Sequence, residues 1–159
     1  MSMKSQKWQI GDVFTVPQTD GKHSLGQVVG QEREALNSVV CAFFDLRGEC
    51  TESDWAPQLL RRKDVIALLF VTRDLLDRGR WRVVGWREPS KLGQDGIVDE
   101  ARSNRYIGVE IRGSGIVEKF LNAFYGLHPW DAWHNPRYLD RLLIDPSRKP
   151  PDSRLIFKP

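Results

Sequence analysis

The run of residues 38–46 constrains the fold most, because it is almost continuously apolar. A strand with one solvated face alternates apolar and polar side chains, whereas a strand covered on both faces is apolar nearly throughout. We therefore expect a central strand at residues 38–46, in a sheet that carries other structure on both of its faces.

A β-hairpin is predicted immediately before this strand. Residues 13–16 form its first strand, and residues 24–29 form the returning one. Asp20 and Gly21 stand between them, and this pair favours tight turns in which both central residues need a positive φ. Gly26 within the returning strand marks either a bulge or a close backbone approach.

Two further strands are expected at residues 64–72 and 81–86, separated by one helical turn over residues 73–79. Successive side chains of a strand point to opposite faces, so Trp81 and Trp86 belong to opposite sides of the second of these strands. We assign both indoles to core packing, with contact to a partner as the alternative.

The clearest helical pattern covers residues 116–125, where apolar side chains recur on one face. Ser114 is a candidate N-cap for this helix, and Gly126 stands where a left-handed C-terminal cap is expected. A short strand over residues 106–111 is predicted before the helix, and a second short helix over residues 136–143 after it.

These elements predict a single α+β domain over residues 1–145, followed by an extended, Pro-rich, basic tail over residues 146–159. The expected architecture is a mainly antiparallel bent sheet, or a partly open small barrel, with two C-terminal helices. A chain of 159 residues buries about two thirds of its unfolded surface, which is enough for a core without disulfides or metal.

The chain contains no apolar run near the length of a membrane span, and residues 1–7 are too polar for a secretory signal. We therefore expect a cytoplasmic protein that does not enter a membrane. Cys41 lies within an apolar run and is expected to be a small buried hydrophobe, and a disulfide with Cys50 is not expected.

The formal net charge of +3 comes entirely from the end of the chain. Residues 1–135 contain 18 Lys and Arg against 18 Asp and Glu, whereas residues 136–159 contain 6 against 3. This neutral body argues against nucleic-acid binding. Two cation groups are interspersed with carboxylates and are interpreted as solvated surface, with a phosphate or acidic-partner site as the alternative: Arg61, Arg62 and Lys63, and Arg78, Arg80 and Arg82.

No pattern in the sequence indicates catalysis. His128, Asp131 and His134 are of types that bind zinc, but their spacing matches no familiar site and Pro129 interrupts helical geometry. No nucleophile with a neighbouring base is recognisable. We expect no catalytic residue, no metal and no cofactor.

Several short segments together resemble the Imm26-type immunity proteins of bacterial polymorphic toxin systems. The resemblance spans about residues 8–144, and His23-Ser24 departs from the pattern. The segments that carry it are Gly11-Asp12-Val13-Phe14, Pro17, Asp20-Gly21-Lys22, Gly26, Phe44-Asp45, Phe124-Tyr125-Gly126-Leu127 and Pro129-Trp130-Asp131.

This resemblance implies a non-enzymatic protein that binds and neutralises a cognate toxin protein. We expect the partner surface on exposed loops, where an aromatic residue flanked by charge makes a good interface centre. The candidate residues are Glu52, Asp54, Trp55, Glu88, Asp95, Asp99 and Glu100. The alternatives are a nucleic-acid-binding or ribonuclease-like small β-barrel protein, and a plain scaffold or adaptor.

Overall fold

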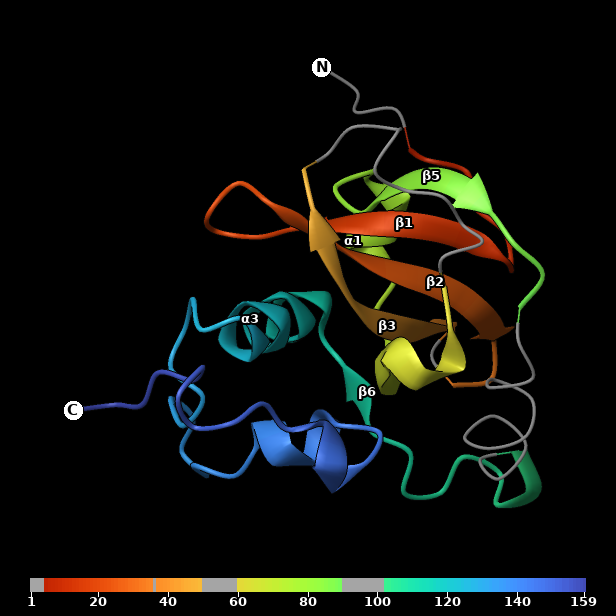
Figure 1. Cartoon of the computed structure of the whole chain (residues 1–159). Coiled ribbons are helices and arrows are strands. Elements are labelled where there is room, and N and C mark those ends of the chain that lie inside the picture. Colours follow the sequence, from red (N-terminus) through yellow and green to blue (C-terminus); the bar gives the residue numbers. More distant parts are fainter. Residues whose placement is uncertain (1–4, 36, 50–59, 90–101) are drawn as a thin grey trace.

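The computed structural model describes residues 5–35, 37–49, 60–89 and 102–159. Its centre is a six-stranded sheet with the order β5-β1-β2-β3-β4-β6 (Figure 1). All neighbouring strands are antiparallel except β4 and β6, which run parallel. The strands are β1 (Asp12–Pro17), β2 (His23–Glu32), β3 (Ser38–Gly48), β4 (Val65–Val71), β5 (Arg82–Trp86) and β6 (Ile111–Arg112). The predicted α+β class with a mainly antiparallel sheet is confirmed, and the sheet is open rather than closed.

The β1–β2 hairpin forms as predicted, but with a different turn. Gly21 alone has a left-handed conformation, with a φ of 87°, and its amide donates to the carbonyl of Gln18 at 3.0 Å. The amide of Gln18 in turn donates to the carbonyl of Lys22 at 2.9 Å, which closes a loop over residues 19–21. This is the three-residue hairpin loop in which only the last loop residue needs a positive φ.

Strand β3 is central, as its composition predicts. It pairs with β2 on one side and β4 on the other, and residues 38–44 are all buried. Alternate residues of β3 point to opposite faces of the sheet and pack in two hydrophobic clusters. Cys41 and Phe43 belong to one cluster, and Val40 and Ala42 belong to the other. The burial of Cys41 confirms its expected structural role, and loss of hydration raises the pKa of its thiol.

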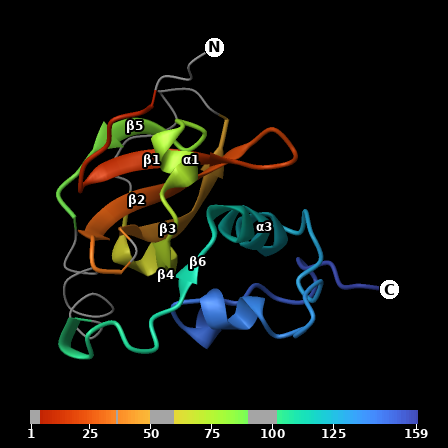
Figure 2. The same ribbon diagram turned by 180° about the vertical axis from the view of Figure 1, so that it is seen from behind.

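One face of the sheet is covered by α1 (Asp74–Asp77), α3 (Ser114–Phe124) and the C-terminal segment. Figures 1 and 2 show α3 between the sheet and this segment in both views. The apolar stripe of α3 is buried as predicted, and Gly126 ends the helix with a φ of 76°. The N-cap residue is Gly113 and not the predicted Ser114, which is the first residue of the helix. The Ser114 hydroxyl donates to Asp74 at 2.7 Å. No helix within the described ranges is both long and apolar enough to cross a membrane.

Gly26 marks a close approach of a side chain. The Phe14 ring lies against the Gly26 backbone, stacks on Trp81 at 5.3 Å between centroids, and meets Phe43 edge-on at 6.1 Å. A ring occupies the space in which any other residue at position 26 would place its Cβ atom. The absence of a side chain at Gly26 therefore lets the Phe14 ring lie against the backbone of β2 and pack with Phe43 and Trp81 in one cluster.

Strand β5 lies at the edge of the sheet, and this corrects the expectation that Trp86 packs in the core. Trp81 is fully buried, whereas Trp86 is 51% exposed. Beyond β5, the Gln6 side chain accepts a hydrogen bond from the Val83 amide at 3.0 Å and donates to the carbonyls of Leu76 and Trp81 at 2.8 Å each. Apolar alternation within residues 81–86 predicts neither the register shift in the pairing of β5 with β1 nor the number of strands next to β5.

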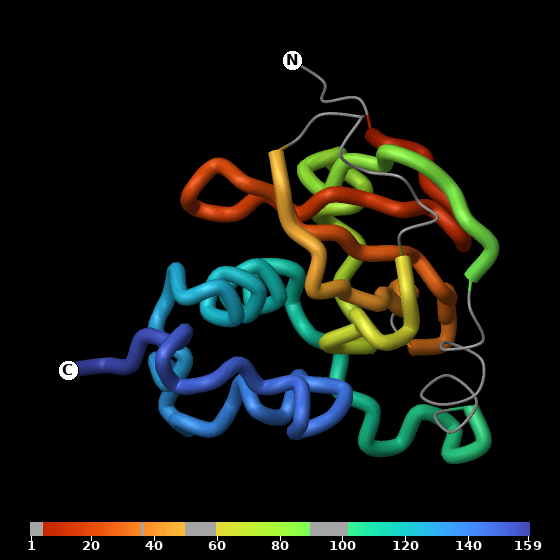
Figure 3. Tube along the Cα trace, viewed as in Figure 1, coloured from red at the N-terminus to blue at the C-terminus, as the bar shows by residue number. Residues whose placement is uncertain are grey.

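Two elements of the C-terminal half differ from their predicted form. Strand β6 is limited to Ile111–Arg112, because Arg105 and Tyr106 have positive φ values of 52° and 61° that no strand contains. The second helix is a 3-10 helix at Leu139–Leu142. The tube in Figure 3 shows how the segment after α3 folds back beneath it.

The last residues of the chain pack against this segment. Trp130 is buried, its amide donates to the carbonyl of Ile156 at 2.8 Å, and Pro129 forms a β-bridge with Ile156. Leu155 is buried beside them. The division into a 1–145 domain and a tail stays a prediction.

Candidate functional site

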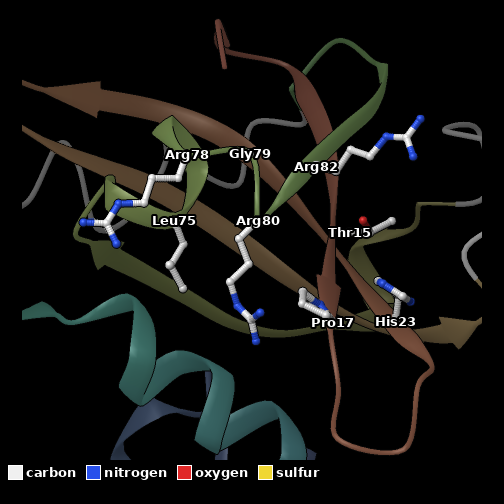
Figure 4. Close-up of a pocket in the computed structure, with 8 residues that line it drawn as sticks. All are labelled: Thr15, Pro17, His23, Leu75, Arg78, Gly79, Arg80 and Arg82. Atoms are coloured by element: carbon white, nitrogen blue, oxygen red, sulfur yellow. The ribbon is translucent and has the colours of Figure 1, made fainter. Parts of the chain in front are cut away.

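A cleft opens where α1 and the loop after it meet the edge of the sheet (Figure 4). We call it the arginine cleft, and its volume is about 640 Å³. Helix α1 and the following loop contribute Leu75, Arg78, Gly79 and Arg80. The strands contribute Thr15, Pro17, His23 and Arg82. Within the part of the chain that the structure describes, three arginines and no carboxylate thus line one surface depression.

Strand pairing positions the sheet side of the arginine cleft. Thr15 of β1 lies opposite Arg82 of β5, and Pro17 lies opposite His23 of β2. The hairpin therefore sets the position of the His23 side chain relative to β5. Residues that are more than 50 positions apart in sequence meet here because β1 pairs with both β2 and β5.

Helix α1 is fixed to the body of the protein by Asp74. Its carboxylate accepts hydrogen bonds from the Thr72 and Ser114 hydroxyls, each at 2.7 Å. Burial alone would raise the pKa of Asp74, but these hydrogen bonds outweigh that effect and hold the pKa below its usual value. Gly79 then takes a φ of 81° and redirects the chain toward β5. The arginines of the cleft therefore stand on an anchored turn.

Arg80 is held by a two-point contact with Glu118 of α3. Its Nε donates to Oε2 at 2.8 Å and its Nη2 donates to Oε1 at 2.9 Å. These hydrogen bonds raise the pKa of Arg80. Glu118 is mostly buried and also accepts a hydrogen bond from the Trp81 indole at 3.1 Å. Its negative charge is therefore already compensated, and three N–H groups of the Arg80 guanidinium stay outside this contact.

Arg78 and Arg82 are exposed and form no recorded ion pair within the described part of the chain. Figure 4 shows them extending to opposite sides of Arg80. The nearby carboxylate of Asp77 is occupied, because it accepts from the Trp8 indole at 2.7 Å and from Arg73 at 2.9 Å. The rim of the cleft is therefore positively charged.

A second feature of β5 is the exposed indole of Trp86. Its Nε1 donates to the carbonyl of Ile10 at 3.1 Å, and the Ile10 side chain is itself 47% exposed. Gly11 has a φ of 101°, and the indole lies where a Cβ atom at that position would be. Trp86 pairs with Asp12 and Arg82 pairs with Thr15, and the register between β1 and β5 shifts between Val13 and Phe14. Because of this shift, the two side chains belong to different faces of the edge strand although they are four residues apart.

The structure places one of the seven partner residues predicted from the sequence. Glu88 is exposed directly after β5, two residues beyond Trp86. The other six lie outside the described residues: Glu52, Asp54, Trp55, Asp95, Asp99 and Glu100. Of the residues around the arginine cleft, the sequence indicated the three arginines as an alternative acidic-partner site, and it gave no signal for Thr15, His23 or Leu75.

Two of the three residues of zinc-binding types, His128 and Asp131, have structural contacts, and the third, His134, is exposed. His128 packs edge-on against Trp133, with 5.5 Å between ring centroids, and loss of hydration lowers its pKa. Asp131 accepts a hydrogen bond from the Lys158 amide at 2.7 Å. Within the described ranges, no three His, Cys, Asp or Glu side chains are arranged to hold a metal ion.

Replacing Asp74 with asparagine should lower the free energy of unfolding at pH 7 by about 1 kcal/mol, because the two hydroxyls lose a charged acceptor at a partly exposed site. Since the folded-state pKa of Asp74 is depressed, its contribution is present at neutral pH and is lost as pH falls below the ordinary Asp value of about 3.9. Urea denaturation at pH 7 and at pH 3 tests this. We expect the difference between wild type and Asp74→Asn to shrink at pH 3, and the exposed Asp152→Asn to show no such change.

Comparison with known proteins gives one match. A sequence model of the family described as immunity protein 26 matches residues 9–104, which is more than half of the chain. The match includes strands β1 to β5 and all three arginines of the cleft, whereas the segment around Trp130 lies beyond it. No curated protein and no solved structure matches the chain.

Proposed function

The chain belongs to the immunity protein 26 family, and from this premise we propose that it binds and neutralises a cognate bacterial toxin without enzymatic activity. The family match is the observation that carries the proposal. An immunity protein protects the cell that makes the toxin, so we further propose that it acts in the cytoplasm. On this proposal its partner is a protein, and it acts by binding that protein.

The surface of the described residues supports a binding function. It presents a cationic cleft at one end of β5 and an exposed indole at the other. Tryptophan and arginine are the residue types most often found at the energetic centres of protein interfaces. The Trp86 indole is also held in place by Ile10 and Gly11, so little conformational entropy is lost when a partner covers it.

We also propose that the exposed loops predicted from the sequence contribute to this surface. Glu88 follows Trp86 and supports the proposal by its exposure. The candidate residues at positions 52–55 and 95–100 are included in this proposal on the basis of the sequence alone. Inhibition is expected to follow from occlusion of the toxin's active site or from fixing one of its conformations.

The test is capture of the tagged protein from its native host, followed by mass spectrometry and a toxicity assay of what is retained. We expect one large multidomain protein whose C-terminal domain stops growth when expressed alone and is harmless when expressed with this chain. As a control, co-expression with an unrelated protein of similar size should leave the toxicity unchanged.

Two results would contradict this function. One is retention of nucleic acid that is displaced at high salt, which would favour the nucleic-acid-binding alternative. The other is a retained protein that is not toxic, which would favour an adaptor.

A further inference from the structure

We propose that the arginine cleft is the docking site for an acidic segment of the toxin, with toxin carboxylates paired to Arg78, Arg80 and Arg82. This inference rests on the proposed function and specifies the part of the surface that carries it. The occupant is a polypeptide segment that bears Asp or Glu side chains next to apolar ones.

The first argument is the charge of the cleft. Among the described residues, its lining contains three guanidinium groups and no carboxylate. Arg80 pairs with Glu118, Asp77 pairs with Arg73, and Arg78 is near enough to Asp74 to help lower the pKa of that carboxyl. Arg78 and Arg82 form no ion pair with the described residues, so the cleft keeps a net positive charge. An uncompensated positive surface attracts an acidic partner during encounter and disfavours a basic one.

The second argument is that the cleft combines charge with apolar surface. Leu75 and Pro17 line it together with the arginines. An isolated phosphate or carboxylate ion would leave these groups uncovered. An acidic peptide segment covers them with its own apolar side chains while its carboxylates reach the guanidinium groups, and this arrangement suits a protein interface.

The third argument is preorganisation. Arg80 is fixed by Glu118 and still has N–H groups outside that contact, while Asp74 and Gly79 fix the turn on which Arg78 and Arg80 stand. A site whose backbone is already ordered loses little entropy when its partner binds. The cationic groups are thus ready to receive carboxylates without a rearrangement of the fold.

The same lining favours polypeptide over nucleic acid. Proteins that bind single strands stack bases on aromatic side chains, whereas no Trp, Tyr or Phe of the described ranges lines this cleft. Two tryptophans adjoin this region but do not line the cleft. The Trp8 indole donates a hydrogen bond to Asp77, and Trp81 is buried in the core. The geometry therefore lacks the platforms on which bases stack.

The test is the double variant Arg78→Gln/Arg82→Gln, which removes two exposed charges and leaves the Arg80–Glu118 contact intact. The probe is the purified toxin domain retained by the wild-type protein, measured by calorimetry at low and at physiological salt. We expect at least tenfold weaker binding for the variant at low salt, and a smaller salt dependence than that of wild type.

The matched control is Arg137→Gln/Arg141→Gln, which removes two exposed charges from the C-terminal segment. That segment lies on the opposite side of α3 from β5 (Figures 1 and 2). We expect its affinity to stay within twofold of wild type. Circular dichroism and urea denaturation of all three proteins show whether each variant is folded.

The outcomes separate the two proposals. If the wild type binds the toxin domain and the cleft variant binds it equally well, the cleft proposal is overturned and the immunity function stands. If the tagged wild type retains no toxic protein from its host, there is no toxin domain to measure, and the immunity function and the cleft proposal are both overturned. If a labelled uridine hexanucleotide binds the wild type, and the cleft variant alone loses that binding, the cleft serves nucleic acid and the acidic-segment proposal is overturned.

Discussion

Replacing Trp130 with alanine should lower the free energy of unfolding by about 3–5 kcal/mol, the range expected when a large buried aromatic side chain is removed. The indole is 1% exposed and packs against Phe120 with 5.9 Å between ring centroids. The Trp130 Nε1 donates to Asp140 at 2.7 Å, so the substitution also removes a hydrogen bond to the Asp140 carboxylate. The resulting cavity would lie between α3 and the 3-10 helix at Leu139–Leu142.

The matched control is Trp86→Ala, because the same residue type is 51% exposed there. Its loss should cost about 1 kcal/mol, since half of the ring is already in water and one hydrogen bond to a backbone carbonyl is removed. Urea denaturation followed by circular dichroism measures both changes without relying on tryptophan fluorescence. Equal losses for the two variants would show that the segment around Trp130 does not contribute to the cooperative core.

Replacing Gly26 with alanine should destabilise the protein by about 2–3 kcal/mol, although only one methyl group is added. The new Cβ atom would lie 2.5 Å from Cζ of Phe14 and 3.3 Å from the carbonyl oxygen of Ala42. Phe14 has little freedom to move away, since it stacks on Trp81 and meets Phe43 edge-on. The strain would spread through all three rings.

Gly115→Ala provides the contrasting change in the same protein. Gly115 lies in α3 and is exposed, and no atom lies within 4 Å of the position of its added Cβ. Alanine has the higher helix propensity, so this variant should be more stable than wild type by up to about 1 kcal/mol. Thermal or urea denaturation of the two variants should give shifts of opposite sign. Shifts of the same sign would mean that the close packing at Gly26 is not what determines its effect.

The sequence predicted those parts of the fold that depend on local pattern. The hairpin, the central β3 strand and the apolar stripe of α3 all follow from side-chain periodicity and glycine placement, and all three are confirmed. Trp86 shows the limit of this approach. Its strand has apolar residues on both sides, but its exposure depends on whether a further strand pairs with β5, which is a property of the whole sheet.

The arginine cleft illustrates the same limit at the level of function. Sequence spacing draws attention to Arg78, Arg80 and Arg82, yet the carboxylates just before them favour a solvated surface. The structure separates the charges, because Asp74 binds hydroxyl groups and Asp77 turns toward Trp8 and Arg73. Which charges remain uncompensated is decided by three-dimensional contacts between α1, α3 and the N-terminal segment.

Gln6 has a consequence for how this protein behaves at high concentration. An edge strand offers unpaired amide and carbonyl groups on which a second chain can extend the sheet, and this is one route to fibres. Here the Gln6 side chain accepts a hydrogen bond from the Val83 amide of β5 and donates to the carbonyl of Trp81, just before the strand, and to that of Leu76 in α1. With Gln6 in place the Val83 amide is not available to a second chain, so Gln6 shortens the part of β5 on which strand addition could begin.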